Sequence, residues 1–261
     1  MILSELHFFS EALDVRSTVN VILPQRSRSE RMKSGNAKFR TLYLLHGYSD
    51  DHTAWQRWTS IERYVEGKDL AVVMPDVHNS FYTDMVHGMK YFTYLTRELP
   101  ILLREILPLS ARREDTFVAG LSMGGYGAFK LALSRPEAYA AAASLSGAVD
   151  ICRDALQVHP EDPGNAAWIA KMRDIFGDLD KVPGSLHDLY ALAKKVAQKP
   201  VRPRLYQYCG TEDFLYTGNV NFRDFIRTLP FDHTYTEGAG DHTWGYWDAE
   251  IQKVIAWLPL Q

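Results

Sequence analysis

The chain contains little cysteine and no long uncharged apolar segment. Its two cysteines, Cys152 and Cys209, are far apart among 261 residues and lack the spacing of metal ligands. This argues against a disulfide framework or a zinc site and favours a reducing compartment. No run of about 18 uncharged apolar residues occurs, so no membrane span is expected. Residues 1–9 lack the positive charges and unbroken apolar stretch of a signal peptide, and together these features predict a cytoplasmic protein.

The charge balance excludes several classes of partner. The formal net charge is -3 and the isoelectric point is near 6.3, so we expect no broad positive field that would attract nucleic acid or anionic lipid. Residues 25–40 are rich in arginine and lysine among serines. A solvated hairpin loop is the favoured interpretation of this segment, and a basic binding patch is the alternative. We therefore expect a small-molecule substrate that is not a polyanion.

Beyond the N-terminal segment, short apolar runs alternate with helical stretches, which is typical of parallel strands joined by crossover helices. The start of the chain and the alternating residues 15–22 indicate an antiparallel strand pair at one edge. Apolar residues recur at helical spacing over residues 95–106, and Pro108 ends this predicted core helix. We expect one α/β domain over residues 1–261, with a mostly parallel central sheet and helices on both faces. The predicted parallel strands are Thr41–Leu45, Ala71–Pro75, Thr116–Ala119, Ala140–Leu145, Arg204–Cys209 and His233–Glu237.

The segment between the fourth and fifth of these strands is too long for one crossover helix. Prolines and glycines divide it into two or three short helical pieces, so we interpret residues 150–199 as a small cap insertion. An apolar stripe at helical spacing occurs there, made of Trp168, Ile169, Met172 and Phe176. Such a stripe either lines a substrate pocket or packs its helix onto the body of the protein.

The segment Gly120-Leu121-Ser122-Met123-Gly124-Gly125 joins a predicted strand to a helix rich in alanine and glycine. A serine at such a turn is the nucleophile of G-x-S-x-G enzymes with the α/β-hydrolase fold. Glycines on both sides remove side chains that would clash at the strained turn, so the hydroxyl projects into the cleft beside the helix N-terminus. Ser122 is therefore the predicted nucleophile. A structural turn serine is the alternative, but it would not account for this position in the chain.

The α/β-hydrolase fold presents its catalytic residues in the order Ser, acid, His, each after a strand. Asp213 follows the fifth parallel strand and is the predicted acid, with its neighbour Glu212 as the competitor. Of the two later histidines, His233 falls within the last strand, whereas His242 lies in a glycine-rich loop before the final helix. We therefore predict that His242 is the base.

A tetrahedral oxyanion needs preorganised donors, commonly two backbone N–H groups. Met123 supplies one because it follows the nucleophile, and Tyr48, in the loop after the first parallel strand, is the predicted second donor. His46 in the same loop is predicted to be structural. Five aromatic residues near the cleft are candidates to hold the acyl or alcohol group, with core packing as the alternative for each. These candidates are Trp55, Phe81, Tyr82, Trp168 and Trp244.

Five motifs are spread along the chain between residues 44 and 247, and the match that they define covers nearly the whole chain. They are Leu44-Leu45-His46-Gly47, Asn79-Ser80-Phe81-Tyr82-Thr83-Asp84, Gly120-Leu121-Ser122-Met123-Gly124-Gly125, Gly210-Thr211-Glu212-Asp213 and His242-x-Trp244-x-x-Trp247. In this combination the chain resembles the esterase family that includes esterase D (S-formylglutathione hydrolase), bacterial tributyrin esterases and carbohydrate esterases such as feruloyl and acetylxylan esterases. It looks most like the tributyrin esterases, through Asn79-Ser80-Phe81-Tyr82, Ile175-Phe176-Gly177 and Ser185-Leu186-His187-Asp188-Leu189. The resemblance implies a cytoplasmic, often oligomeric enzyme that acts on short-chain acyl esters.

These observations predict a serine carboxylesterase that hydrolyses short-chain acyl esters through an acyl-enzyme on Ser122. The chemistry needs a nucleophile, a base and an oxyanion site, so we expect no metal or organic cofactor. One alternative is a thioesterase of the S-formylglutathione hydrolase type. Those enzymes typically carry a cysteine just after the oxyanion glycine, and Tyr48-Ser49-Asp50-Asp51 has none. A second is an acetyl or feruloyl esterase acting on plant carbohydrate esters, and a third, from a different class, is a catalytically silent binding module.

Overall fold

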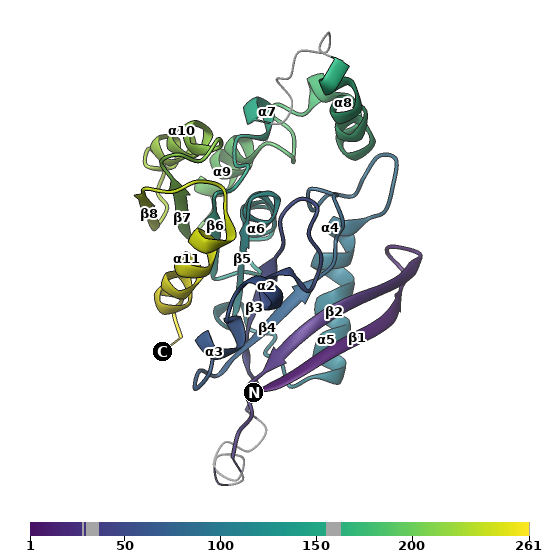
Figure 1. Ribbon diagram of the computed structural model, residues 1–261, viewed down its shortest axis with the longest axis vertical. Helices are drawn as coiled ribbons and strands as arrows, with labels where there is room; N and C mark the ends of the chain where they lie inside the picture. The colour runs from purple at the N-terminus through teal and green to yellow at the C-terminus, as the bar shows by residue number, and fades with distance from the viewer. Residues whose placement is uncertain (28, 30–36, 155–162, 261) are drawn as a thin grey trace.

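The computed structural model describes residues 1–27, 29, 37–154 and 163–260, and a sheet of eight strands forms the centre of the molecule (Figure 1). The strands are β1 (Ile2–Ser10), β2 (Val15–Leu23), β3 (Arg40–Leu45), β4 (Leu70–Pro75), β5 (Thr116–Leu121), β6 (Ala141–Leu145), β7 (Arg204–Gly210) and β8 (His233–Gly238). Their order across the sheet is β1-β2-β4-β3-β5-β6-β7-β8. Strands β3 to β8 run parallel to one another, whereas β2 pairs antiparallel with both β1 and β4.

The predicted sheet, mostly parallel with an antiparallel edge, is confirmed. Every predicted parallel strand is present, and its ends differ from the prediction by at most two residues. The difference that matters is at β5, which continues past Ala119 to Leu121 and so ends directly before Ser122. The central strands are buried throughout because helices cover both faces, and their sequences are near-continuously apolar for this reason.

Helices on the two faces of the sheet enclose two hydrophobic cores. One face carries α2 (Ala54–Trp58), α3 (Ile61–Tyr64) and α11 (Trp244–Trp257). The other face carries α5 (Leu99–Ile106), α6 (Met123–Ser134), α9 (Leu189–Ala197) and α10 (Tyr216–Ile226). Among the helices that the structure describes, none is both long and apolar enough to cross a membrane.

The predicted helix over residues 95–106 begins with a π-helical turn that leads into α5. Pro100, near the start of α5, has no N–H to continue the ordinary pattern of helical hydrogen bonds, which accounts for the change of winding. Leu95, Leu99 and Leu103 are buried as predicted, whereas Ile106 is 55% exposed, so the core stripe is shorter than expected. The short elements in this part of the chain are α4 (Tyr91–Thr93), the π turn (Tyr94–Glu98) and a 3-10 turn (Arg113–Asp115).

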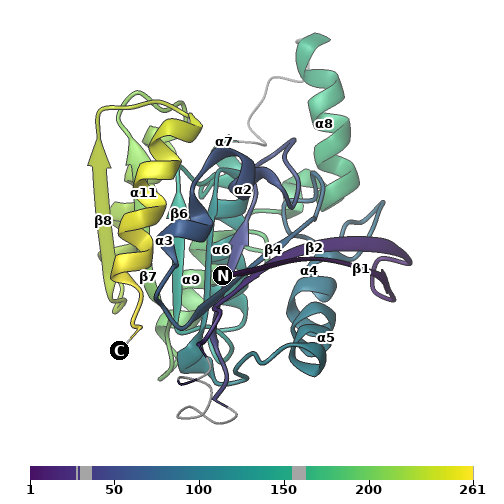
Figure 2. The same cartoon turned by 60° about the horizontal axis from the view of Figure 1, so that its bottom comes forward.

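The predicted insertion at 150–199 contains α7 (Ile151–Asp154), α8 (Pro163–Phe176), a 3-10 turn (Leu179–Lys181) and α9. Helix α9 packs against α6, whereas α8 extends away from the other helices at the end of the sheet where the parallel strands end (Figures 1 and 2). Ile169, Met172 and Phe176 of α8 are buried, so most of the apolar stripe packs the helix onto the body. Residues 155–162 of the insertion, and residues 28 and 30–36 of the predicted basic loop, lie outside the described residues.

Candidate active site

Ser122 occupies a tight turn between β5 and α6. Its backbone angles are φ 52° and ψ -119°, a conformation that is unfavourable for a residue with a side chain and is typical of functional sites. Its N–H donates to the carbonyl of Leu145 at 2.9 Å, which fixes the turn to the neighbouring strand β6. A Cβ atom at Gly120 would collide with the carbonyl oxygen of Gly124. The glycines that flank the serine therefore let the strand and the helix meet at this turn.

Asp213 and His242 come together from the ends of the two neighbouring strands β7 and β8. Nδ1 of His242 lies 2.8 Å from Oδ2 of Asp213, and the other carboxylate oxygen accepts the N–H of Leu215 at 2.9 Å. An ionised carboxylate only accepts hydrogen bonds, so Nδ1 carries the proton that is shared with it. The other ring nitrogen, Nε2, is then free to accept a proton from a neighbouring hydroxyl.

The charge state of Asp213 follows from its surroundings. Burial by itself raises the pKa of this carboxyl. The hydrogen bond and charge of His242, with the N–H of Leu215, outweigh burial and hold the pKa below its ordinary value. Asp213 is therefore ionised at neutral pH, and its side chain is completely shielded from solvent.

The competitor Glu212 points elsewhere. Its carboxylate accepts the N–H of Gly240 and the hydroxyl of Thr211, and these bonds lower its pKa, with the Gly240 bond contributing most. Gly240 belongs to the loop that carries His242. Glu212 thus holds this loop, while Asp213 contacts the imidazole itself.

The two predicted oxyanion donors, Tyr48 and Met123, line the same pocket as Ser122. Met123 is the first residue of α6, where backbone N–H groups have no acceptor within the helix. The loop of Tyr48 lies against the nucleophile, since a Cβ atom built on Gly47 would be 3.7 Å from Cβ of Ser122.

His46 holds this loop, as predicted for a structural residue. Its Nε2 accepts the N–H of Val77 at 3.1 Å, so the proton sits on Nδ1, which donates to the carbonyl of Gly47 at 2.8 Å. Burial lowers the pKa of His46 despite the nearby acidic residues, so the ring stays neutral.

A pocket of about 310 Å³ contains Ser122, Met123, Tyr48 and His242 together. The remaining lining residues are Phe81, Ala148, Trp168, Phe214 and Leu215. Two of the predicted substrate-binding aromatics, Phe81 and Trp168, are thus in the pocket wall. The mostly apolar lining suits an acyl or alcohol group of modest size.

The other three aromatic predictions require correction, because Trp55, Tyr82 and Trp244 do not line this pocket. Trp55 is buried beside the carboxyl end of β3, where its indole N–H donates to the carbonyl of Leu45 at 2.9 Å. Tyr82 is completely buried and its hydroxyl donates to the carbonyl of His46 at 2.8 Å. Trp244 packs edge-on against Trp55 with ring centroids 5.2 Å apart. All three therefore support the loops behind the pocket.

Sequence reasoning missed Phe214, which is 74% exposed and whose ring centroid lies 4.5 Å from that of His242. Leu215 and Ala148 were missed as well. The available signal was adjacency, because Phe214 and Leu215 directly follow the predicted acid in the chain. The direction in which an exposed loop residue points leaves no periodic pattern in the sequence.

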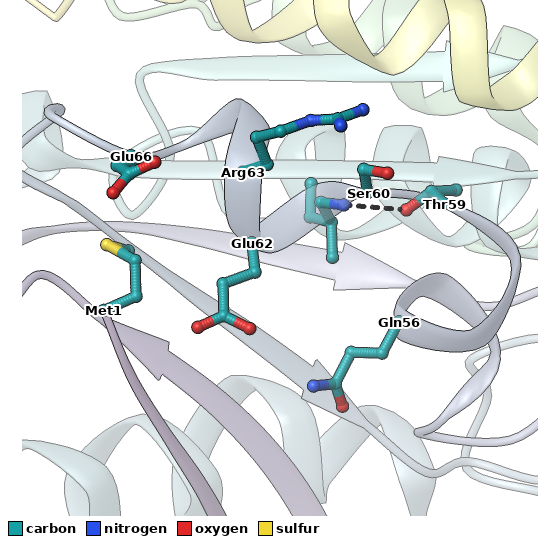
Figure 3. A pocket seen from close by; sticks show the side chains of 8 residues that line it. Met1, Gln56, Thr59, Ser60, Glu62, Arg63 and Glu66 are labelled. Atoms are coloured by element: carbon teal, nitrogen blue, oxygen red, sulfur yellow. Dashed lines mark hydrogen bonds between the residues drawn. The ribbon is translucent and has the colours of Figure 1, made fainter.

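A second hollow, of about 420 Å³, lies away from this pocket and contains none of the predicted catalytic residues. Figure 3 shows its lining, which includes Gln56, Glu62, Arg63 and Glu66 around α2 and α3. The N–H of Ile61 donates to Thr59 Oγ1 at 3.1 Å there. Within the described ranges, no three His, Cys, Asp or Glu side chains are placed to hold a metal ion.

The fold and the pocket define the class of protein, a serine esterase with the α/β-hydrolase fold. The family described as "Putative esterase" matches residues 10–258. The chain belongs to this family, in agreement with the resemblance drawn from its motifs.

Relatives with full-length similarity agree with this assignment. An acetyl esterase of Caldicellulosiruptor saccharolyticus is 33% identical over 99% of this chain and 98% of its own. The solved structure of FphF, a fluorophosphonate-binding serine hydrolase of Staphylococcus aureus, is 35% identical, covers 98% of both chains and has a TM-score of 0.88. The S-formylglutathione hydrolase FrmB of the same organism is also 35% identical with 98% coverage of both chains and a TM-score of 0.85.

Proposed function

We propose that this esterase hydrolyses short-chain acyl esters through an acyl-enzyme on Ser122, with His242 as general base and Asp213 as its partner. The observation that carries the proposal is the 2.8 Å bond between His242 and Asp213 at the edge of the pocket into which the strained Ser122 turn opens. A nucleophile and a base in one pocket, with an acid behind the base to orient it, are what acyl transfer requires.

The steps follow from this arrangement. Nε2 of His242 takes the proton of Ser122 as Oγ bonds to the ester carbonyl carbon, and the carbonyl oxygen becomes an oxyanion. The N–H groups of Tyr48 and Met123 stabilise that charge, each contributing about 3–4 kcal/mol to lowering the barrier. When the tetrahedral intermediate collapses, the alkoxide leaves with the proton from His242. Water then attacks the acyl-enzyme with the same base, which releases the carboxylate and restores Ser122.

The size of the pocket supports a short acyl chain. At about 310 Å³ it lies at the small end of the range for small-molecule sites, roughly 300–1,000 Å³. The likeness to tributyrin esterases and the acetyl esterase relative point in the same direction. Acetate to butyrate esters are therefore the proposed substrates.

Replacing Ser122 tests the proposal. Ser122→Ala should lower kcat on p-nitrophenyl acetate and butyrate by roughly 10⁴–10⁶-fold. Ser134→Ala, at the far end of the same helix, is the matched control and should keep wild-type kcat. Ser122→Ala activity near that of the wild type would exclude Ser122 as the nucleophile. A fluorophosphonate probe that fails to label Ser122 would instead favour the catalytically silent binding module.

The thioester S-formylglutathione is a second candidate substrate, because FrmB, which is 35% identical to this chain, is an S-formylglutathione hydrolase. The missing cysteine after the oxyanion glycine weighs against it. Comparison of kcat/KM on S-formylglutathione and on p-nitrophenyl butyrate with the same preparation decides between the two. Esters of acetylated and feruloylated oligosaccharides belong in the same panel, since Phe81 and Trp168 could stack on an aromatic or sugar ring.

We also propose a domain organisation, a cellular location and an oligomeric state for the enzyme. Residues 150–199 act as a cap of a single domain, which is supported by Trp168 of α8 in the pocket wall. The likeness to tributyrin esterases supports a cytoplasmic location and a homo-oligomer. Cell fractionation tests the first of these two, and sedimentation of the purified protein tests the second.

A further inference from the structure

Lys130 is a charged residue in the interior that the proposed mechanism does not use. It lies on α6, the helix that begins next to Ser122, and its side chain is completely buried. Within the described part of the chain no carboxylate lies within 4.0 Å of its amine. A buried amine without an ion pair is costly unless other groups accept its hydrogen bonds. Its partners therefore show what this lysine holds.

The first partner leads to the wall of the substrate pocket. The Lys130 amine donates to Oγ1 of Thr83, and the Thr83 hydroxyl donates to the carbonyl oxygen of Phe81 at 3.0 Å. Phe81 and Tyr82 have φ angles of 48° and 53°, in the left-handed region that residues other than glycine rarely adopt. The chain at Phe81 thus needs external support, and Thr83 and Lys130 supply it.

The second partner leads to the same wall from behind. The Lys130 amine lies 3.2 Å from Nδ1 of His187. The His187 ring packs edge-on against Phe176 with centroids 5.2 Å apart, and Phe176 lies 5.8 Å from the ring of Phe81. Burial, with the charge of Lys130, lowers the pKa of His187 to about 3, so His187 is neutral and can accept the hydrogen bond.

We propose that Lys130 is a positioning residue that determines substrate selectivity: by bonding to Thr83 and His187 together, it holds the Phe81 ring as a fixed wall of the Ser122 pocket. The proposal rests on the proposed function, because it assigns the pocket to the substrate. Lys130 and Ser122 belong to one helix and its N-terminal turn, so the wall is held at a constant distance from the nucleophile. Without Lys130 the Phe81 segment can relax from its strained conformation and change the shape of the pocket.

The charge of Lys130 adds a dependence on pH that a purely packing role would lack. Burial lowers the pKa of Lys130 to about 7, against the opposing effect of Asp84. Two other groups that face Lys130 are uncharged at neutral pH: His187, and the phenol of Tyr126, whose pKa burial raises well above its ordinary value. Two charged groups, Arg97 and Arg135, line the same hollow as Asp84 and Lys130. Below pH 7 the ammonium donates charge-assisted bonds, and above it the neutral amine donates weaker ones.

Fluorophosphonates with short and long alkyl chains are the probe, because they bond to the nucleophile whatever the natural ester is. Lys130→Met removes both bonds at similar volume, and Thr83→Val breaks only the link to Phe81. For each variant we expect the ratio of labelling rates, long chain over short chain, to change by about tenfold, comparable to the effect of one methylene group in an apolar pocket. The wild-type ratio should also change between pH 6 and pH 8.5, and the change with pH should disappear in Lys130→Met.

A double variant and a control separate this role from general loss of stability. Lys130→Met with Thr83→Val should change the ratio by less than the product of the two single changes, since both single variants disrupt the Lys130–Thr83 bond. Ile255→Ala, in the core on the opposite face of the sheet, should lower Tm and leave the ratio unchanged. If Lys130→Met does not fold, Thr83→Val carries the same test.

The two proposals fail in different ways. Labelling of Ser122 at the wild-type ratio in Lys130→Met and Thr83→Val, at both pH values, overturns the role of Lys130. Absence of labelling on Ser122 in the wild type overturns the proposed function itself.

Discussion

Replacement of Gly124 by alanine tests how closely the nucleophile helix must approach the oxyanion loop. Gly124 lies in the first turn of α6, two residues after Ser122. A Cβ atom there would collide with the carbonyl oxygen of Leu45, and it would lie 2.6 Å from the carbonyl oxygen of His46. Both oxygens belong to the backbone at the end of β3, so no side-chain rotation can relieve the contact.

The expected effect follows from the distance that must be gained. Ordinary contacts begin at about 3.5 Å, so the helix and the loop that carries Tyr48 must separate by roughly 1 Å. Overpacking of this kind costs about 1–3 kcal/mol of stability. A displacement of about 1 Å at a catalytic group costs roughly 100-fold in rate, and loss of one oxyanion donor costs a similar factor or more. We therefore expect kcat of Gly124→Ala to fall by roughly 100-fold.

Steady-state kinetics on p-nitrophenyl acetate and urea unfolding measure the two effects separately. Gly245→Ala in α11 is the matched control, because a Cβ atom there meets nothing within 4 Å. It should keep wild-type kcat and a stability within about 0.5 kcal/mol of the wild type. A folded Gly124→Ala enzyme with wild-type kcat would refute both the close approach and the oxyanion role of Tyr48.

Two further changes address charge. Asp213→Asn should lower kcat by roughly 10⁴-fold because the amide favours the wrong tautomer of His242. Glu212→Gln can still accept the Gly240 N–H, so its kcat should fall far less. Equal losses of kcat in the two variants would contradict the choice of Asp213 as the acid. For Lys130 the folded pKa of about 7 lies below the ordinary value of about 10.4, so the unfolded chain binds more protons between these values and wild-type stability rises with pH there. Urea unfolding measures the stability of Lys130→Met relative to the wild type. This difference should become less favourable to the variant by about 1–3 kcal/mol between pH 6 and pH 9. A difference that stays constant with pH would show that burial does not lower the pKa of Lys130.

The fold and the order of the predicted catalytic residues could be read from the sequence because their signals are local. A buried strand, a turn with flanking glycines and a helix leave a pattern within about ten residues, and the Ser122 segment contains all three. The same holds for His242, whose glycine-rich loop separates it from His233 in β8. Even the extension of β5 to Leu121 changed only the end of a correctly predicted strand.

The tertiary structure decided which side chains share a space. Trp55 and Phe81 are both aromatic residues in loops near the carboxyl ends of strands, yet the first lies in the core on one face and the second lines the pocket. Only the structure shows that Glu212 turns toward Gly240 and Asp213 toward His242. A lysine is almost always expected at the surface, so the burial of Lys130 could not be read from the sequence, and its amine bonds to Thr83 and His187 from distant segments. Side-chain direction and burial depend on contacts between elements far apart in the chain, and no local pattern encodes those contacts.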